Sequence, residues 1–123
     1  MEWSTPRRFL LVSRSADDQW NQVLQEALTV LGPVQVASEG ELNACLQERI
    51  YDAVIVDAGA VSSPLEELIF QIQALDSGVK IVIVTASPHW KIAKAVIRAG
   101  AADYLEKSLN REEIISSFRA ILE

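Results

Sequence analysis

A short apolar run that ends on an acid, Tyr51 to Gly59 (YDAVIVDAG), constrains the fold of this chain more than any other stretch. Its centre is β-branched and apolar, and it lacks the polar alternation of a strand with one face in water. Such a run is typical of a strand buried on both faces, in a parallel sheet between two layers of helices. Asp57 then lies where the strand leaves the sheet, at the edge where open α/β sheets bind ligands. We therefore expect Asp57 to be the central functional residue of a site at this edge.

Apolar runs of this kind alternate with amphipathic stretches along the whole chain. Besides the run that ends at Asp57, strands are predicted over 9–12, 34–37, 79–84 and 102–105. A helix is predicted after each strand, and each begins near a residue that can cap it: Ser15, Ser38, Ser63, Ser87 and Asn110. This pattern predicts an α/β fold, a three-layer α/β/α sandwich with five helices and a five-stranded parallel sheet in the order 2-1-3-4-5. Asp57 would lie at its switch point.

Length and charge restrict the class of protein. With 123 residues we expect a single domain over 1–123, in which residues 1–7 are a lead segment. The net charge of -6 argues against nucleic acid or an anionic membrane as the direct partner. No apolar stretch has transmembrane length, and the single cysteine, Cys45, falls on an apolar helix face where we expect it to be buried. A reduced, cytoplasmic location fits these features.

Polar residues follow four of the predicted strands, and the carboxyl ends of parallel strands share one edge. They are Ser13 with Arg14, Asp57, Thr85 and Lys107. A carboxylate can attack phosphorus and form an acyl phosphate, while a lysine and a hydroxyl can stabilise the phosphoryl oxygens. A purely structural interpretation is also open: Asp57 and Lys107 form an ion pair and Thr85 caps a loop.

From the first strand to the last helix, the chain resembles the receiver domain of bacterial two-component response regulators. The matching motifs are YDAVIVDAG with Asp57 at the phospho-acceptor position, IVIVTAS with Thr85, and AGAADYLEKS with Tyr104 and Lys107. The resemblance implies that Asp57 takes a phosphoryl group from a histidine kinase or a small phosphodonor, and that Thr85 and Tyr104 then move.

The resemblance also implies a signalling domain rather than an enzyme. Its expected output is a contact of the fourth helix, fifth strand and fifth helix with a downstream protein or an output domain, and a second copy of the chain is a further candidate partner. No output domain follows the fifth helix in this sequence, so we expect a stand-alone receiver or a fragment of a longer regulator.

The positions after the first strand depart from the receiver pattern. Receivers usually carry two acids there, which position Mg²⁺, whereas this chain has Ser13 and Arg14. Mg²⁺ is expected for the family, but its acidic ligands are missing here, so we predict no metal and no other cofactor. Asp17 and Asp18 are better explained as favourable charges at a helix N-terminus than as substitute ligands.

Arg14 has two open interpretations. It pairs with Asp57 as a built-in cation, or it points into solvent and leaves a pocket without metal. Either one predicts that Mg²⁺-assisted phosphorylation is severely impaired. Ser108 is a second departure: receivers commonly have proline after the lysine, joined by a cis bond, and a cis bond here would cost about 2.5–4 kcal/mol. We therefore predict a trans bond, which leaves open whether the Lys107 side chain reaches Asp57.

Two alternative functions remain. One is a pseudo-receiver that never takes phosphate and acts as a binding or dimerisation module. The other is a flavin binder on the same fold, which the glycine-free, acidic segment SRSADD disfavours. Along the predicted fourth helix, Lys91, Lys94 and Arg98 form a basic strip, which is either a solvated helix face or a docking strip for an acidic partner.

Overall fold

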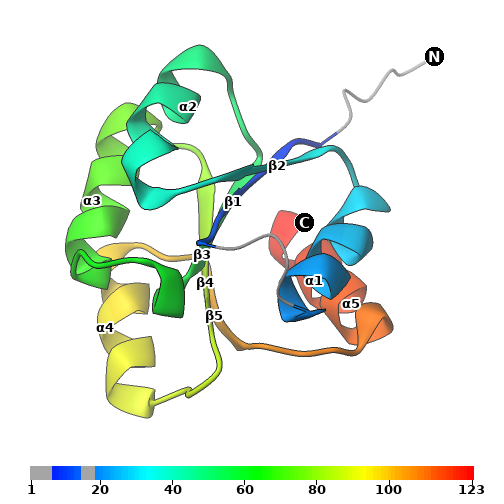
Figure 1. The fold of residues 1–123 in the computed structure, drawn as a ribbon. Coiled ribbons are helices and arrows are strands. Elements are labelled where there is room, and N and C mark those ends of the chain that lie inside the picture. Colours follow the sequence, from blue (N-terminus) through cyan, green and yellow to red (C-terminus); the bar gives the residue numbers. More distant parts are fainter. Residues whose placement is uncertain (1–6, 15–18) are drawn as a thin grey trace.

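The structure of the protein is a computed structural model, which describes residues 7–14 and 19–123. A twisted parallel sheet lies between two layers of helices, as Figure 1 shows. The strands pair in the order β2-β1-β3-β4-β5, which confirms the predicted topology. Their bounds are β1 (Phe9–Val12), β2 (Val34–Ala37), β3 (Ala53–Asp57), β4 (Lys80–Thr85) and β5 (Asp103–Glu106).

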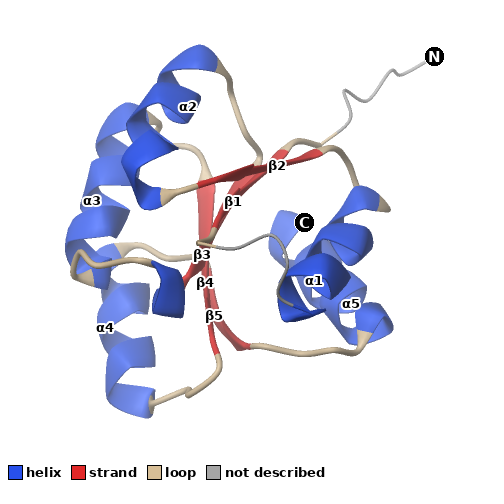
Figure 2. Ribbon diagram, viewed as in Figure 1, coloured by secondary structure: helices blue, strands red, loops and turns tan. Residues whose placement is uncertain are grey.

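The helices are divided between the two faces of the sheet (Figures 1 and 2). One face is covered by α2 (Leu42–Glu48), α3 (Leu65–Leu75) and α4 (Trp90–Ala99). The other is covered by α1 (Gln19–Thr29) and α5 (Arg111–Leu122). Two short 3₁₀ turns, η1 (Glu39–Glu41) and η2 (Ala58–Ala60), follow β2 and β3.

Successive residues of the central strand pack against opposite helix layers. Val54 and Val56 belong to the core beneath α2, α3 and α4, whereas Ala53 and Ile55 belong to the core beneath α1 and α5. All four are fully buried. Because both faces of β3 are covered, its positions 53–56 are all apolar, and this explains the absence of alternation in the sequence. Cys45 is buried under the first layer, as predicted.

Two of the five predicted helix starts are confirmed by their hydrogen bonds. Asn110 caps α5, and its Oδ1 accepts from the backbone N–H of Glu113 at 3.1 Å. Ser38 and Glu41 form a capping box at η1, directly before α2. Ser15 lies outside the described residues. These caps were recognisable because the partner is three residues away in the chain.

Two other helices begin later than predicted. Pro64, rather than Ser63, is the N-cap of α3, because the Ser63 hydroxyl is bonded to Glu39 instead. The N-cap of α4 is His89 rather than Ser87, and His89 Nδ1 accepts from the backbone N–H of Lys91 at 3.1 Å. At α3 a contact outside the helix takes the predicted capping hydroxyl, whereas at α4 a closer residue, His89, caps the first turn.

Three apolar side chains that helical spacing in the sequence places on inward faces are exposed: Ile50, Leu75 and Ile92. Ile50 is 84% exposed because α2 already ends at Glu48 and the chain leaves it in an extended conformation at Arg49. Ile92 is 42% exposed, since α4 turns Val96 most deeply towards the sheet. Within the described ranges, no helix is long and apolar enough to cross a membrane.

Candidate functional site

Asp57 is the last residue of β3 and lies at the carboxyl edge of the sheet. Its side chain is buried, with 6% of the residue exposed. Its Oδ1 accepts a hydrogen bond from the backbone N–H of Gly59 at 3.0 Å, which makes Asp57 the N-cap of η2. This bond holds the carboxylate at the start of the β3–α3 loop.

Lys107 is the ion-pair partner of Asp57. Its Nζ lies 3.0 Å from Asp57 Oδ1, and its backbone N–H donates to the carbonyl of Thr85 at 2.8 Å. The two residues meet because β4 separates β3 from β5 and all three strands end at the same edge. No peptide bond in the described ranges is cis, so Lys107 reaches Asp57 across a trans bond to Ser108.

The ammonium of Lys107 also lies over an aromatic ring. Its Nζ is 4.2 Å from the centroid of the Trp20 ring, near the start of α1. Trp20 is buried, with 7% exposed, and belongs to the core beneath α1 and α5. In the sequence Trp20 is an apolar residue at helical spacing in α1, and that spacing does not reveal a partner that follows β5.

The Ser13 position, where receivers carry an acid, is filled by a neutral hydrogen-bonded group. Ser13 is buried, and its Oγ accepts from Asn21 Nδ2 at 2.8 Å. Asn21 is fully buried on α1, and its Oδ1 accepts from Gln25 Nε2 at 2.9 Å. Sequence reasoning missed Asn21, because its place on an otherwise apolar helix face was the only signal.

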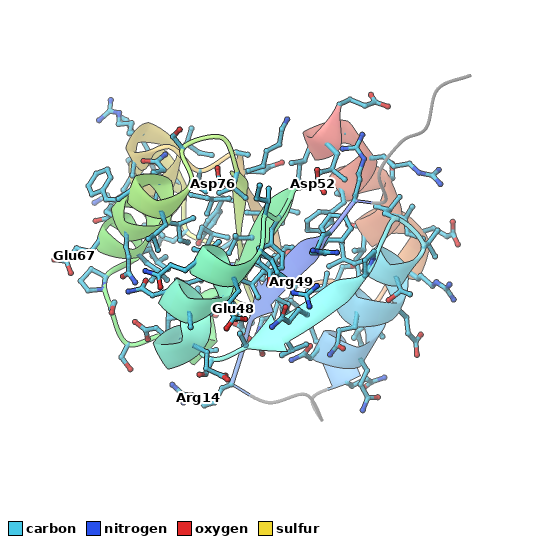
Figure 3. All side chains as sticks on the ribbon, turned by 90° about the horizontal axis from the view of Figure 1, so that it is seen from above. Arg14, Glu48, Arg49, Asp52, Glu67 and Asp76 are labelled. Atoms are coloured by element: carbon cyan, nitrogen blue, oxygen red, sulfur yellow. The ribbon has the colours of Figure 1, made fainter. Side chains whose placement is uncertain are left out.

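Arg14 follows Ser13 at the carboxyl edge of the sheet, and among the described residues it forms no ion pair with Asp57. It is exposed, and Figure 3 shows it at the end of the molecule opposite Asp52 and Asp76. Within the described residues the ion pair of Asp57 is with Lys107, so the interpretation that Arg14 points to solvent is the one that fits.

The described residues at this edge do not fit a Mg²⁺ ion. Mg²⁺ requires a near-octahedral set of oxygens and is normally held by one or two carboxylates together with waters. Asp57 supplies a carboxylate, but its Oδ1 is already paired with the Lys107 ammonium. The Ser13 hydroxyl is bonded to Asn21. In the part of the chain that is described, no group of three or more His, Cys, Asp or Glu side chains could hold a metal. Asp17 and Asp18 lie outside it.

Thr85 and Tyr104, the two residues predicted to move, are both bonded to the loop between β4 and α4. Thr85 Oγ1 accepts from the backbone N–H of Ser87 at 3.1 Å. The Tyr104 hydroxyl accepts from the backbone N–H of His89 at 3.3 Å, and its ring packs against the core beneath α4. The β4–α4 loop therefore contacts both side chains, while their movement stays a prediction.

Glu39 is a further residue near the site that sequence reasoning missed. It lies in η1, and its carboxylate accepts from the backbone N–H of Ser62 at 2.7 Å and from the hydroxyl of Ser63. These bonds join the β2–α2 connection to the loop that follows Asp57. The bond from Ser63 is the main reason that the pKa of Glu39 lies below its ordinary value of 4.5.

We expect the Glu39 contact to make stability depend on pH. A carboxyl group with a lowered folded-state pKa contributes stability that is complete above its unfolded pKa, near 4.5, and is lost as the pH falls through the lower folded value. Glu39→Gln should therefore reduce the free energy of unfolding at neutral pH, and the difference from the unsubstituted chain should shrink on acidification. Urea unfolding over this pH range measures it. Glu26→Gln, at an exposed position on α1, is the control, and an equal pH dependence in both variants would contradict the expectation.

Comparison with known proteins identifies the family. Residues 14–119 match the family model of the response regulator receiver domain. The transcriptional regulatory protein PhoP of Escherichia coli (strain K12) is 32% identical over 82 residues, which are 67% of this chain and 37% of PhoP. This chain therefore spans well under half the length of that relative.

Solved structures share the fold at low sequence identity. A response regulator from Thermotoga maritima superposes with a TM-score of 0.84 at 22% identity, over 96% of this chain and 98% of the other. HP1043, an orphan response regulator of H. pylori, superposes with a TM-score of 0.81 at 18% identity, over 95% and 97%. By its match over most of its length, this chain belongs to the family of response regulator receiver domains of two-component signalling systems.

Proposed function

We propose that this domain transmits a signal through a protein contact, that Asp57 occupies its phospho-acceptor position, and that its pocket does not support Mg²⁺-assisted phosphorylation. The observation that carries the proposal is the replacement of the acidic pair. Ser13 is bonded to Asn21 and Arg14 is exposed, so neither presents a charged oxygen to a metal beside Asp57. The proposed partners are a histidine kinase or another phosphodonor, and a downstream protein or output domain.

The chemistry proposed for Asp57 is phosphoryl transfer to its carboxylate. A carboxylate oxygen attacks the phosphorus of a phosphohistidine, an O–P bond forms and the P–N bond breaks. The imidazole leaves with the electron pair and takes a proton from water, and Asp57 becomes an acyl phosphate. Lys107, 3.0 Å from Asp57 Oδ1, is placed to offset the charge on the phosphoryl oxygens, and Thr85 is proposed to donate a hydrogen bond to one of them. Without a divalent ion, we expect this transfer to be slow.

The test is phosphorylation by a small donor. The domain is incubated with acetyl phosphate or phosphoramidate in the presence of Mg²⁺, and its intact mass is then measured. We expect little or no gain of a phosphoryl group under conditions that phosphorylate a receiver with the acidic pair. Asp57→Asn is the control for modification at other residues. Ready, stoichiometric gain of one phosphoryl group would contradict the proposal.

A second candidate function is a phosphorylation-independent pseudo-receiver that binds a partner or dimerises constitutively. One observation favours it: Asp57 already has a cation from its own chain, in a partly buried ion pair with Lys107. The two candidates differ in the effect of Asp57→Asn on partner binding or signalling. Loss of the signal supports a phosphorylated receiver, whereas an unchanged signal supports the pseudo-receiver.

A further inference from the structure

We propose that Trp20 is a positioning residue for Lys107, and that its ring holds the ammonium against Asp57 in the unphosphorylated domain. The functional importance of this contact rests on the proposed function of Asp57. The contact itself is an independent feature, because the Lys107 Nζ lies 4.2 Å from the centroid of the Trp20 ring.

The position of the ring favours a strong contact. Cation–π attraction increases when both partners are removed from water. Trp20 is 7% exposed, and the side chain of Lys107 is 19% exposed. The chain contains a second pair of this kind for comparison, in which Lys91 Nζ lies 5.6 Å from the ring of Trp90. Trp90 is 68% exposed, so water weakens that contact.

The ring completes the set of contacts that determines where the ammonium lies. The backbone of Lys107 is held by its bond to the Thr85 carbonyl, and its Nζ is held by Asp57. Between these ends, the four-carbon side chain has many rotamers. A buried ring beside the ammonium disfavours those rotamers in which Lys107 turns outward. Trp20 thereby keeps Lys107 at Asp57 without a cis bond at Ser108.

The first test uses the unsubstituted chain in NMR spectroscopy. Protons above an indole face resonate upfield because of the ring current. We expect the Hε protons of Lys107 to resonate upfield of those of Lys94, which is exposed on α4. The shift should disappear in Trp20→Leu. Equal Hε shifts for Lys107 and Lys94 in the unsubstituted chain would overturn the proposal, and this result does not depend on whether any variant folds.

The second test measures how accessible Lys107 is to acylation by a small N-hydroxysuccinimide ester, with Lys94 as the internal standard. Loss of a cation–π contact should raise the relative rate at Lys107 about 3- to 30-fold in Trp20→Leu. Trp20→Phe keeps an aromatic face and should restore most of the protection. Trp90→Leu, which removes the exposed ring, is the matched control and should leave Lys107 unchanged.

The outcomes separate this proposal from the function proposed for Asp57. Neither measurement requires phosphorylation, so an upfield Lys107 together with protection restored by phenylalanine supports positioning even if Asp57 never takes phosphate. An unchanged rate at Lys107 in a folded Trp20→Leu variant overturns positioning and leaves the phosphorylation experiment unaffected. Circular dichroism establishes whether Trp20→Leu is folded. If it is not, the comparison of Lys107 with Lys94 by NMR in the unsubstituted chain decides the proposal.

Discussion

Replacing Ser13 and Arg14 together by aspartate is expected to give this domain Mg²⁺-dependent phosphorylation at Asp57. The rate with acetyl phosphate should rise at least about a hundredfold over that of the unsubstituted chain, because a bound metal contributes several kcal/mol of charge stabilisation and each 1.4 kcal/mol is a factor of ten. The gain should vanish when Mg²⁺ is removed with a chelator.

The surroundings of both positions favour this gain. Asn21 Nδ2 already donates to the Ser13 side chain, so it can donate equally to a carboxylate placed there. Such a bond compensates part of the cost of burying the charge. Replacing Arg14, an exposed residue after β1, also removes a fixed positive charge from the edge of the sheet where the metal would bind.

Intact mass measured over time, with and without Mg²⁺, tests this expectation. The same two substitutions combined with Asp57→Asn are the control and should show no gain in mass. Substitution of each position singly shows whether one acid is sufficient. A double variant that is folded, as judged by circular dichroism, could still be phosphorylated no faster than the unsubstituted chain. That result would show that the missing acids do not explain the impaired phosphorylation.

Gly32→Ala is expected to destabilise the protein by about 3 kcal/mol, because a side chain there has no space. A Cβ atom at Gly32 would lie 1.6 Å from the backbone carbonyl oxygen of Arg7. That oxygen belongs to the segment entering β1, whose first residue, Phe9, donates its N–H to the carbonyl of Pro33 at 2.9 Å. To admit the methyl group, the start of β1 must move away from β2.

Thermal unfolding measures this effect, and the midpoint should fall by roughly 10 °C. Gly40→Ala is the matched control, because the nearest heavy atom to a Cβ there is Ser38 Oγ at 4.0 Å. It should unfold close to the unsubstituted chain. Equal midpoints for the two variants would show that the start of β1 moves at little cost.

The candidate site was predictable to the extent that it depends on strand order. An aspartate and a lysine that follow the two strands on either side of β4 come to the same edge of the sheet once the strand order is known, and Asp57 and Lys107 do form an ion pair. Whether they act on phosphate remains a proposal. Asn21 and Glu39 could not be predicted, because each bonds to a residue that is distant in the chain or on another element.

Helix boundaries, too, were predictable only where they depend on residues close in the chain. The Asn110 cap was predicted because its partner, the N–H of Glu113, is three residues away. The predicted cap at Ser63 was wrong because Glu39 competes for its hydroxyl. Gly32 could be recognised as a helix stop, but the close approach of Arg7 that excludes a side chain is visible only in the folded chain.

Apolar periodicity and local caps predicted the α/β class, because both depend on neighbours along the chain, and the few strand orders common in such sheets then gave the edge at which Asp57 lies. Packing between distant elements determines that Asn21 bonds to Ser13, that Arg14 is exposed, and that Trp20 lies against Lys107. Periodicity states which face of an element is buried. It does not state which side chain lies across from it, because that depends on how the helices pack on the sheet.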